Sequence, residues 1–396
     1  MSESSLERFA RHKLRSLERR QLQRELATSD RGAAVTIERD GERLVSFSCN
    51  DYLGLAHDPA TRAAAIAATE KLGTGAGASR LITGSHSLYR ELEGKLAALK
   101  ATDDAVVFGS GYLANVGLIP LFCGKPDLIL IDALAHSSLL TGASLSGATL
   151  LDFPHNDAAT ANALLAAHRH QHRHCLILTE GVFSMDGDLA PLPALAKLAE
   201  RHDAWLMTDD AHGLGVVGGG RGSDFAFTPP PLVPLKMGTL SKAVGAYGGY
   251  LCASHTVCEL VRNRARSFVY STGLPPGTVA AATAALAIIG QDPDRVARPL
   301  ALARRFCVAL ELPAARSAIV PLVFGGNREA LAASDTLRRA GYLVAAIRPP
   351  TVPPGTARLR FTFSAAHSDA DVEGLITAVQ LLLRDRRQVS PQGLPA

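Results

Sequence analysis

The chain has 396 residues, and its 41 lysines and arginines against 37 aspartates and glutamates give a formal net charge of +4. Charge this evenly balanced argues against a nucleic-acid-binding protein, and no apolar run reaches the ~18 residues that a membrane span needs. The length predicts two or three domains, and the scattered cysteines, without a C-x-x-C pair, indicate reduced thiols in the cytoplasm.

The N-terminal segment, residues 1–49, is predicted to form one helix and two short strands. Leucines and a phenylalanine recur at roughly helical spacing up to about Arg24. Residues 35–39 and 44–48 are expected to be strands around an Asp-Gly turn. Charges run through the first twenty residues, which have no apolar stretch of the kind found in a secretory signal.

From Asn50 the chain alternates between short apolar runs and helical stretches such as residues 192–201. Runs of valine, isoleucine and leucine without polar alternation are typical of strands buried on both faces, and their alternation with helices predicts a parallel sheet. The strand candidates are residues 105–108, 128–131, 175–179, 205–208 and 249–253. We therefore expect a large α/β domain over residues 50–290.

The pattern changes near Pro293, which predicts a smaller α+β domain over residues 291–387. Its expected elements are helices at residues 295–308, 330–340 and 369–383 and strands at residues 318–324 and 358–363. The last nine residues, 388–396, are expected to be disordered.

Two glycine patterns suggest nucleotide binding, and neither is complete. The segment at residues 73–77 would need a glycine at position 80 to form G-x-G-x-x-G, and Arg80 stands there. The Gly-Lys pair at residues 124–125 is followed by Pro126, where a phosphate-binding P-loop needs serine or threonine. A nucleotide-dependent oxidoreductase is therefore disfavoured.

Four histidines alternate with arginine and glutamine from His168 to His174. Imidazoles at this spacing could share a metal. Two interleaved arginines, and the absence of cysteine or carboxylate partners nearby in the sequence, favour a solvated helix end. We predict no metal site here or elsewhere.

The first segment that carries chemistry is residues 206–213, where a buried strand is followed by Asp209, Asp210 and His212. Ligands of open α/β sheets bind at the carboxyl ends of the strands. A carboxylate there can keep a pyridinium nitrogen protonated, which makes the ring of pyridoxal phosphate an electron sink. Taken alone, the segment would also suit a metal pair or a capping cluster.

Lys242 lies among small residues, with hydroxyls at Thr239 and Ser241 before it and glycines after it. This setting suits a Schiff-base lysine beside a phosphate, because hydroxyls donate to phosphate oxygens and glycines let the backbone approach. Residues 108–115 add a strand, a glycine turn and the start of a helix, an arrangement that binds anions. Together the three segments predict a pyridoxal phosphate site.

These segments resemble the α-oxoamine synthases, the fold-type I pyridoxal phosphate enzymes that condense an amino acid with an acyl-CoA. The similarity runs from about Asn50 to about His367 and includes residues 179–188, 238–242 and, most tellingly, 346–360. Within the family the chain is most similar to the biotin-pathway branch. That similarity implies L-alanine and a pimeloyl thioester, carried by CoA or a carrier protein, as substrates.

The resemblance implies an α/β fold with a mixed, mostly parallel sheet in the large domain and a smaller C-terminal α+β domain. It also implies a homodimer with its sites at the interface. Cysteine usage, charge and hydropathy predict a cytoplasmic protein with neither nucleic acid nor membrane as a partner. One alternative is a glycine C-acyltransferase of the 2-amino-3-oxobutyrate or 5-aminolevulinate type, which would use the same machinery.

Each matching residue acquires an implied role. Lys242 would form the covalent link to the cofactor, and Asp209 would pair with its ring nitrogen. The other cofactor contacts would be His212 and Ser184 at the ring oxygen, His136 on the ring face, Gly111, Tyr112 and Thr239 at the phosphate, and Thr272 at the phosphate from the second subunit. The substrate contacts would be Arg360 on the carboxylate, Asn50 and Tyr52 beside it, and Arg348 facing the acyl chain.

A catalytically silent relative is disfavoured, because such a protein has no reason to retain the cofactor residues together with Arg360. The N-terminal arginines, Arg19, Arg20 and Arg24, could meet CoA phosphates, although a solvated helix face accounts for them better. Arg80 and His86 lie in a glycine-rich loop and are given no chemical step.

Overall fold

The computed structural model describes residues 4–20, 22–24, 26–32 and 35–389. Its centre is a seven-stranded sheet in the order β4-β10-β9-β8-β7-β5-β6. The strands are β4 (Asp104–Phe108), β5 (Leu128–Asp132), β6 (Thr149–Phe153), β7 (Cys175–Glu180), β8 (Trp205–Asp209), β9 (Leu235–Thr239) and β10 (Gly249–Ala253). Six of these strands run in the same direction and β10 is antiparallel to both of its neighbours, which confirms the predicted mixed, mostly parallel sheet.

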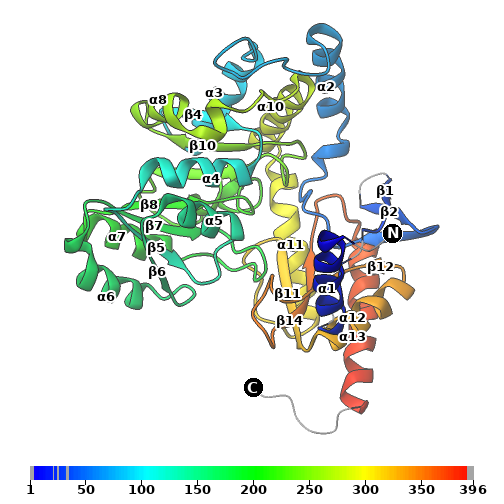
Figure 1. Cartoon of the computed structure of the whole chain (residues 1–396). Coiled ribbons are helices and arrows are strands. Elements are labelled where there is room, and N and C mark those ends of the chain that lie inside the picture. Colours follow the sequence, from blue (N-terminus) through cyan, green and yellow to red (C-terminus); the bar gives the residue numbers. More distant parts are fainter. Residues whose placement is uncertain (1–3, 21, 25, 33–34, 390–396) are drawn as a thin grey trace.

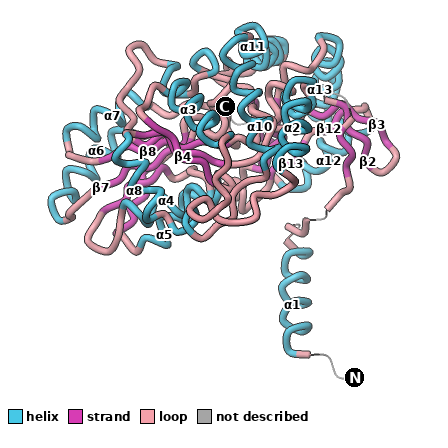
Figure 2. The backbone as a smooth tube through the Cα atoms, turned by 90° about the horizontal axis from the view of Figure 1, so that it is seen from above, coloured by secondary structure: helices cyan, strands magenta, loops and turns pink. Residues whose placement is uncertain are grey.

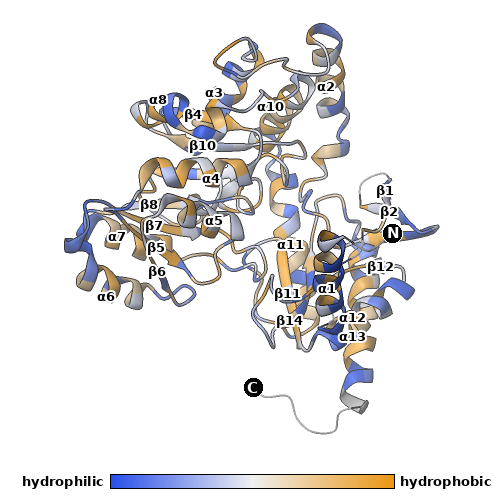
Figure 3. Cartoon of the chain, viewed as in Figure 1, coloured by the Kyte–Doolittle hydropathy of each residue, from blue (hydrophilic) through white to orange (hydrophobic). Residues whose placement is uncertain are grey.

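Helices cover both faces of this sheet (Figure 1). One face packs against α4 (Gly111–Phe122), α5 (Ser137–Ser146), α8 (His255–Arg264) and α9 (Arg266–Val269). The other packs against α3 (Leu88–Lys100), α6 (Ala158–His168), α7 (Leu192–Arg201) and α10 (Pro276–Gln291), with α2 (Pro59–Leu72) beside α10. Figure 3 shows the central strands largely in hydrophobic colours, as expected for strands buried on both faces.

A second core lies in the C-terminal part, where phenylalanines of α11 and β14 pack together. A three-stranded antiparallel sheet, β11 (Ile319–Gly325), β14 (Ala357–Thr362) and β13 (Ala345–Ile347), packs with α11 (Pro293–Ala309), α12 (Asn327–Arg339) and α13 (Asp369–Val389). The N-terminal strands β1 (Ser29–Arg31), β2 (Thr36–Arg39) and β3 (Glu42–Ser46) join β12 (Tyr342–Leu343) in a further sheet. The chain between β3 and α2 therefore starts at the small core and enters the large one.

The first helix, α1 (Ser5–Arg19), stands off the body of the molecule (Figure 2). None of its residues is buried, and Leu6 and Phe9 are 71% and 59% exposed. The predicted end at Arg24 is wrong, because the helix stops at Arg19 and the chain turns toward β1. Among the described residues, no helix combines the length and apolar character that crossing a bilayer requires.

Other sequence-based boundaries also need correction. The second N-terminal strand begins and ends two residues earlier than predicted, and α13 continues six residues beyond position 383 to Val389. Strands β6 and β9 were not predicted, because their polar residues, such as Asp152 and Lys236, break the apolar runs. Residues 390–396 of the predicted tail lie outside the described part of the chain.

His155 connects three segments at the carboxyl edge of the sheet through hydrogen bonds. Its Nδ1 lies 3.0 Å from Asp132 Oδ1 and its Nε2 lies 2.9 Å from Asp188 Oδ2. Although burial opposes the charged form, hydrogen bonds to these two carboxylates raise the pKa of His155 to about 10. The imidazolium therefore links the segments after β5, β6 and β7 near neutral pH.

We expect the His155 contribution to stability to be complete below about pH 6.5, the ordinary histidine pKa, and to fade as the pH rises through about 10. His155→Gln should cost about 1 kcal/mol at pH 7, a value discounted for partial exposure, and much less at pH 10.5. Thermal unfolding of both proteins at the two pH values measures the difference. His202→Gln, at a site bonded to Asn162, is the control, and an equal His155→Gln deficit at both pH values would contradict the prediction.

Candidate active site

A cavity of about 270 Å³ opens where β7, β8 and β9 end and α4 begins. Parallel strands present their carboxyl ends at one edge, so residues distant in sequence meet there. The cavity is lined by the predicted residues Gly111, Tyr112, His136, Asp209, His212, Thr239 and Lys242. It is also lined by Ser110, Ser138, Glu180, Ala211, Met237, Ser241 and Tyr247.

Asp209 is the last residue of β8 and is 5% exposed. Asn115 donates from Nδ2 to Asp209 Oδ2 at 2.8 Å, and the Ala211 amide donates to Oδ1 at 3.1 Å. These donors hold the carboxylate at the cavity wall, where it can pair with a protonated ring nitrogen. Asn115 was not predicted as a site residue, although it ends the predicted strand–turn–helix segment.

Lys242 follows β9 at the same edge of the sheet. Burial lowers the pKa of its ammonium group, against the opposing effect of the Asp209 and Glu180 carboxylates. A lysine whose pKa is lowered has more of its amine in the neutral, nucleophilic form. The setting therefore suits covalent attachment to an aldehyde.

Glu180 is a buried carboxyl group that the sequence analysis missed. Its Oε2 accepts the Ser184 amide at 3.1 Å, while Oε1 has no hydrogen-bond partner among the described residues. Burial and the nearby Asp209 carboxylate raise its pKa well above the ordinary value. An unpartnered polar atom at a cavity wall is the expected mark of a site that holds a polar ligand.

His136 caps the N-terminus of α5. The Ser138 amide donates to His136 Nδ1 at 3.2 Å, which requires that nitrogen to be unprotonated. Burial lowers the pKa of the imidazole, and the Lys242 charge lowers it further, against the effect of Asp209. A neutral ring at the cavity wall can stack on an aromatic ligand.

His212 is buried and its Nδ1 lies 2.7 Å from the Tyr52 hydroxyl. Burial lowers the pKa of His212 well below its ordinary value, and the Lys242 and Arg360 charges act in the same direction. The Tyr52 hydroxyl also accepts from Arg360 Nη2 at 3.3 Å. Tyr52 thus connects His212, on the large sheet, to Arg360, on β14 of the small core.

Arg360 is buried, 6% exposed, between the two cores. Its other donors reach the Ser184 carbonyl oxygen and Asn50 Oδ1, the latter at 3.2 Å. All of these acceptors are uncharged, and no described carboxylate forms an ion pair with Arg360. The structure thus brings the predicted residues Asn50, Tyr52 and Ser184 together around Arg360. The guanidinium of Arg360 can donate two hydrogen bonds to one carboxylate.

The N-terminus of α4 forms the other end of the cavity. Ser110 accepts the Leu113 amide at 3.1 Å, which leaves the amides of Gly111 and Tyr112 at the first turn. A Cβ on Gly111 would lie 3.4 Å from the Thr239 Cβ, so the helix start and the end of β9 are in contact. Thr239 Oγ1 lies 2.8 Å from Ser241 Oγ. Helix amides together with two hydroxyls are an arrangement that can bind a phosphate.

Of the predicted residues, Thr272 and Arg348 lie neither at this cavity nor around Arg360. Thr272 pairs with Ser79 in an isolated bridge, and it does not line the cavity of its own chain. Arg348 lies beside the N-terminal segment, where its Nη2 is 3.4 Å from the Gln23 carbonyl oxygen. Arg24 donates to Thr351 in the same region at 3.0 Å, so the assignment of Arg24 to a helix face is wrong.

Arg80 and His86, to which no chemical step was assigned, lie in the loop before α3. Arg80 forms two hydrogen bonds to Glu93 and lies 3.8 Å above the Tyr89 ring. The His86 ring also contacts Tyr89, with the ring centroids 4.6 Å apart and the planes tilted by 31°. These contacts fix the loop against α3, so a structural role accounts for Arg80.

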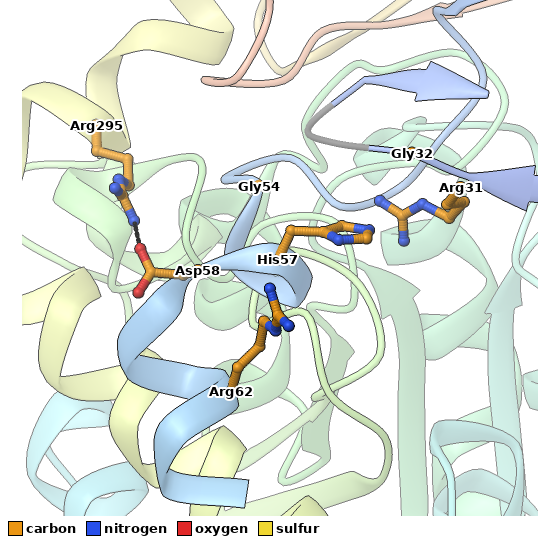
Figure 4. A pocket seen from close by; sticks show the side chains of 7 residues that line it. All are labelled: Arg31, Gly32, Gly54, His57, Asp58, Arg62 and Arg295. Carbon is orange, nitrogen blue, oxygen red and sulfur yellow. Dashed lines mark hydrogen bonds and ion pairs between the residues drawn. The ribbon is translucent and has the colours of Figure 1, made fainter. Parts of the chain in front are cut away.

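A separate pocket of about 440 Å³ lies beside Gly54, between α2, α11 and the segment after β1 (Figure 4). It is rich in arginine, but Arg295 is paired with Asp58 at 2.8 Å and Arg31 with Asp51 at 3.1 Å. Apart from Gly54 its lining residues are Arg31, Gly32, His57, Asp58, Arg62 and Arg295. None of them lines the cavity around Lys242, so this pocket is distinct from the candidate active site.

The model of the aminotransferase class I and II family matches residues 42–379. A curated relative from Beijerinckia indica, an 8-amino-7-oxononanoate synthase, is 57% identical over 380 residues, covering 96% of this chain and 98% of the relative. A serine palmitoyltransferase from S. paucimobilis, solved with a bound PLP–myriocin aldimine, superposes with a TM-score of 0.91 at 28% identity, covering 97% and 99%. An 8-amino-7-oxononanoate synthase from Francisella tularensis gives 0.71 at 25%, covering 86% and 98%.

We expect Asn115→Ala to weaken pyridoxal phosphate binding about tenfold, because the buried Asp209 carboxylate would lose a charge-assisted hydrogen bond. A titration of the apoprotein followed by absorbance gives the dissociation constant. Asn263→Ala is the matched control, since Asn263 is exposed and bonds only the Glu259 carbonyl oxygen among the described residues. Equal affinities for wild type and Asn115→Ala would refute the prediction.

Proposed function

The chain belongs to the aminotransferase class I and II family, and from that premise we propose that it condenses L-alanine with a pimeloyl thioester. The products are 8-amino-7-oxononanoate, carbon dioxide and free CoA or carrier, a step of biotin biosynthesis. The observation that carries this function is the meeting of Lys242, Asp209 and His212 with Arg360 across the two cores. The 57% identity to a synthase of this name over nearly the whole chain supports it.

The enzyme is a transferase that uses pyridoxal phosphate, and the cavity fits that group. When bound, the cofactor supplies an electron sink for a carbanion at the amino acid's Cα. Asp209 would hold the ring nitrogen protonated, His136 would lie on the ring face and His212 would bond the ring oxygen. The α4 amides, Thr239 and Ser241 would hold the phosphate.

Arg360 would bind the carboxylate of L-alanine, with Asn50 and Tyr52 beside it. This contact would orient the Cα–H bond of the substrate for deprotonation. Lys242 Nζ, which lines the same cavity, would act as the general base that accepts the Cα proton. Its lowered pKa favours the neutral form that accepts a proton.

A second copy of the chain would complete the site. Thr272 lies against residues 78–79, next to Leu81, Ile82 and Tyr270, which are 52%, 76% and 75% exposed. Exposed apolar side chains gathered at one place are typical of an interface. In a homodimer this face would be covered, and Thr272 would reach the phosphate end of the partner's cavity.

The cytoplasm is the compartment that we assign to this enzyme. All six cysteines are free thiols, five of them buried. Free thiols of this kind accord with a reducing compartment.

Assays of CoA release test the reaction directly. Pimeloyl-CoA and acetyl-CoA are each supplied with L-alanine or glycine, and we expect kcat/KM to be highest for L-alanine with pimeloyl-CoA, by about tenfold or more over glycine. Pimeloyl-carrier protein in place of pimeloyl-CoA identifies the natural carrier. Release that depends on glycine and acetyl-CoA would instead assign the chain to the glycine C-acyltransferases.

We expect Lys242→Ala to abolish the visible absorbance of the holoenzyme and the borohydride-stable link to the cofactor, because Lys242 is the only lysine among the described residues that line the cavity. Mass spectrometry of reduced, digested protein locates the link. Lys197→Ala, on the exposed side of α7, should leave both signals unchanged. A cofactor link that survives in Lys242→Ala would overturn the assignment.

A further inference from the structure

A cluster of four charged side chains lies buried beneath the turn that follows β8. Lys100, at the end of α3, is fully buried, and its Nζ lies 2.9 Å from Asp210 Oδ2 and 3.0 Å from Asp224 Oδ1. It also donates to the Arg221 carbonyl oxygen at 2.6 Å. Lys236 Nζ lies 2.8 Å from Asp224 Oδ2 on the other side. None of the four lines the cavity around Lys242.

Asp210 connects this cluster to the candidate active site, because it directly follows Asp209 in the chain. Asp209 and Asp210 are adjacent, yet they point to different surroundings: Asp209 bonds Asn115 at the cavity wall, and Asp210 bonds Lys100 in the interior. His212 follows two residues later, at the cavity again. The turn from 209 to 213 therefore carries two cofactor residues on one side and one buried ion pair on the other.

The Asp210 carboxylate has no room to move. A Cβ on Gly213 or on Gly222 would lie 1.9 Å from its oxygens, and a Cβ on Gly181 would lie 2.5 Å away. Its two oxygens accept the Ser223 amide at 3.1 Å each. Three segments, after β7, after β8 and before residue 223, thus close around one carboxylate.

The backbone of the same turn is fixed as well. The Asp210 amide donates to the Met237 carbonyl oxygen at 2.8 Å, and its own carbonyl oxygen accepts the Gly213 amide at 3.1 Å. Met237 lies on β9, the strand that leads to Lys242. Rotation of Asp210 would therefore displace Asp209, His212 and the neighbouring strand together.

Burying charge is costly, and an apolar pair of similar volume often stabilises a protein as well or better. Stability alone is therefore a weak reason for an ion pair at this place. Directional hydrogen bonds, in contrast, fix an orientation that apolar packing does not.

We infer that Lys100 and Asp210 are positioning residues that orient Asp209 and His212 toward the cofactor ring. They touch neither cofactor nor substrate, and they act through the turn that they hold. The inference rests on the proposed function, because the orientation of Asp209 and His212 affects catalysis only if the cofactor binds in this cavity.

The test compares Asp210→Asn and Lys100→Met with wild type as holoenzymes. Asp210→Asn keeps the side-chain shape but removes the charge and places an amide N–H2 where Lys100 and Ser223 now donate. We expect each variant to bind pyridoxal phosphate about tenfold more weakly, the factor for one charge-assisted hydrogen bond. We also expect the pH midpoint of the cofactor's visible absorbance to shift by about half a unit or more, because Asp209 and His212 set the ionisation of the ring.

Arg262→Met is the control for a purely structural loss. Arg262 forms a two-point ion pair with Asp104 at the far end of β4, and its removal should lower the thermal midpoint while leaving both cofactor readouts unchanged. Asp210→Asn or Lys100→Met with wild-type affinity and pH midpoint would overturn the inference, whatever their thermal stability. A wild-type protein that failed to bind pyridoxal phosphate would overturn the proposed function, and this inference with it.

If Lys100→Met does not fold, the double variant Lys100→Met/Asp210→Asn removes one positive and one negative charge and keeps the Asp224–Lys236 pair. Circular dichroism confirms its fold before titration. We expect it to show the same weakened affinity and shifted pH midpoint. Wild-type values in the folded double variant would overturn the inference, because the ion pair would then be dispensable for orientation.

Discussion

Three buried carboxyl groups at the ends of β7 and β8 are the constraint around which this molecule is built. Glu180 pairs with Asp209 across β7 and β8 at the edge of the sheet, Asp210 follows Asp209, and each of the three is at most 5% exposed. Negative charge cannot be removed from water there without donors or cations close by. The structure meets this requirement in separate ways: Asp210 has Lys100, Asp209 has Asn115 and a backbone amide, and Glu180 is biased toward its neutral form.

The separation of these carboxyl groups explains how one short turn serves both fold and chemistry. Asp210 is satisfied within the protein and closes three loops onto each other. Asp209 retains accessible space at the cavity wall, so its charge remains available to a ligand. Asp209 can therefore bind a cationic ring, while the adjacent Asp210 is already neutralised by its ion pair with Lys100.

Arg360 has the opposite requirement, because it is a buried cation and needs a negative charge close by. The described hydrogen-bond partners of Arg360 are all neutral, so a bound anion can balance its charge. The Tyr52 hydroxyl contacts both Arg360 and His212. Because Arg360 belongs to the small core and Asp209 to the large one, the amino acid and the cofactor would be held by different parts of the chain. The packing of the two cores therefore sets the distance between the carboxylate and the ring.

The sequence by itself determined the buried strands of the sheet, four of which it located to within one residue at each end and a fifth without error, and the identity of half of the residues that line the cavity. These features are local: apolar runs specify buried strands, and Asp209, His212, Thr239 and Lys242 lie within short segments around strand ends. Only the tertiary structure decided which polar groups face each other. Ser138 and Glu180 reach the cavity and Asn115 reaches the Asp209 carboxylate from three different segments, and Asp210 turns away from the cavity although it neighbours Asp209. Such pairings depend on how strands and helices pack over long sequence separations, which a local pattern does not encode.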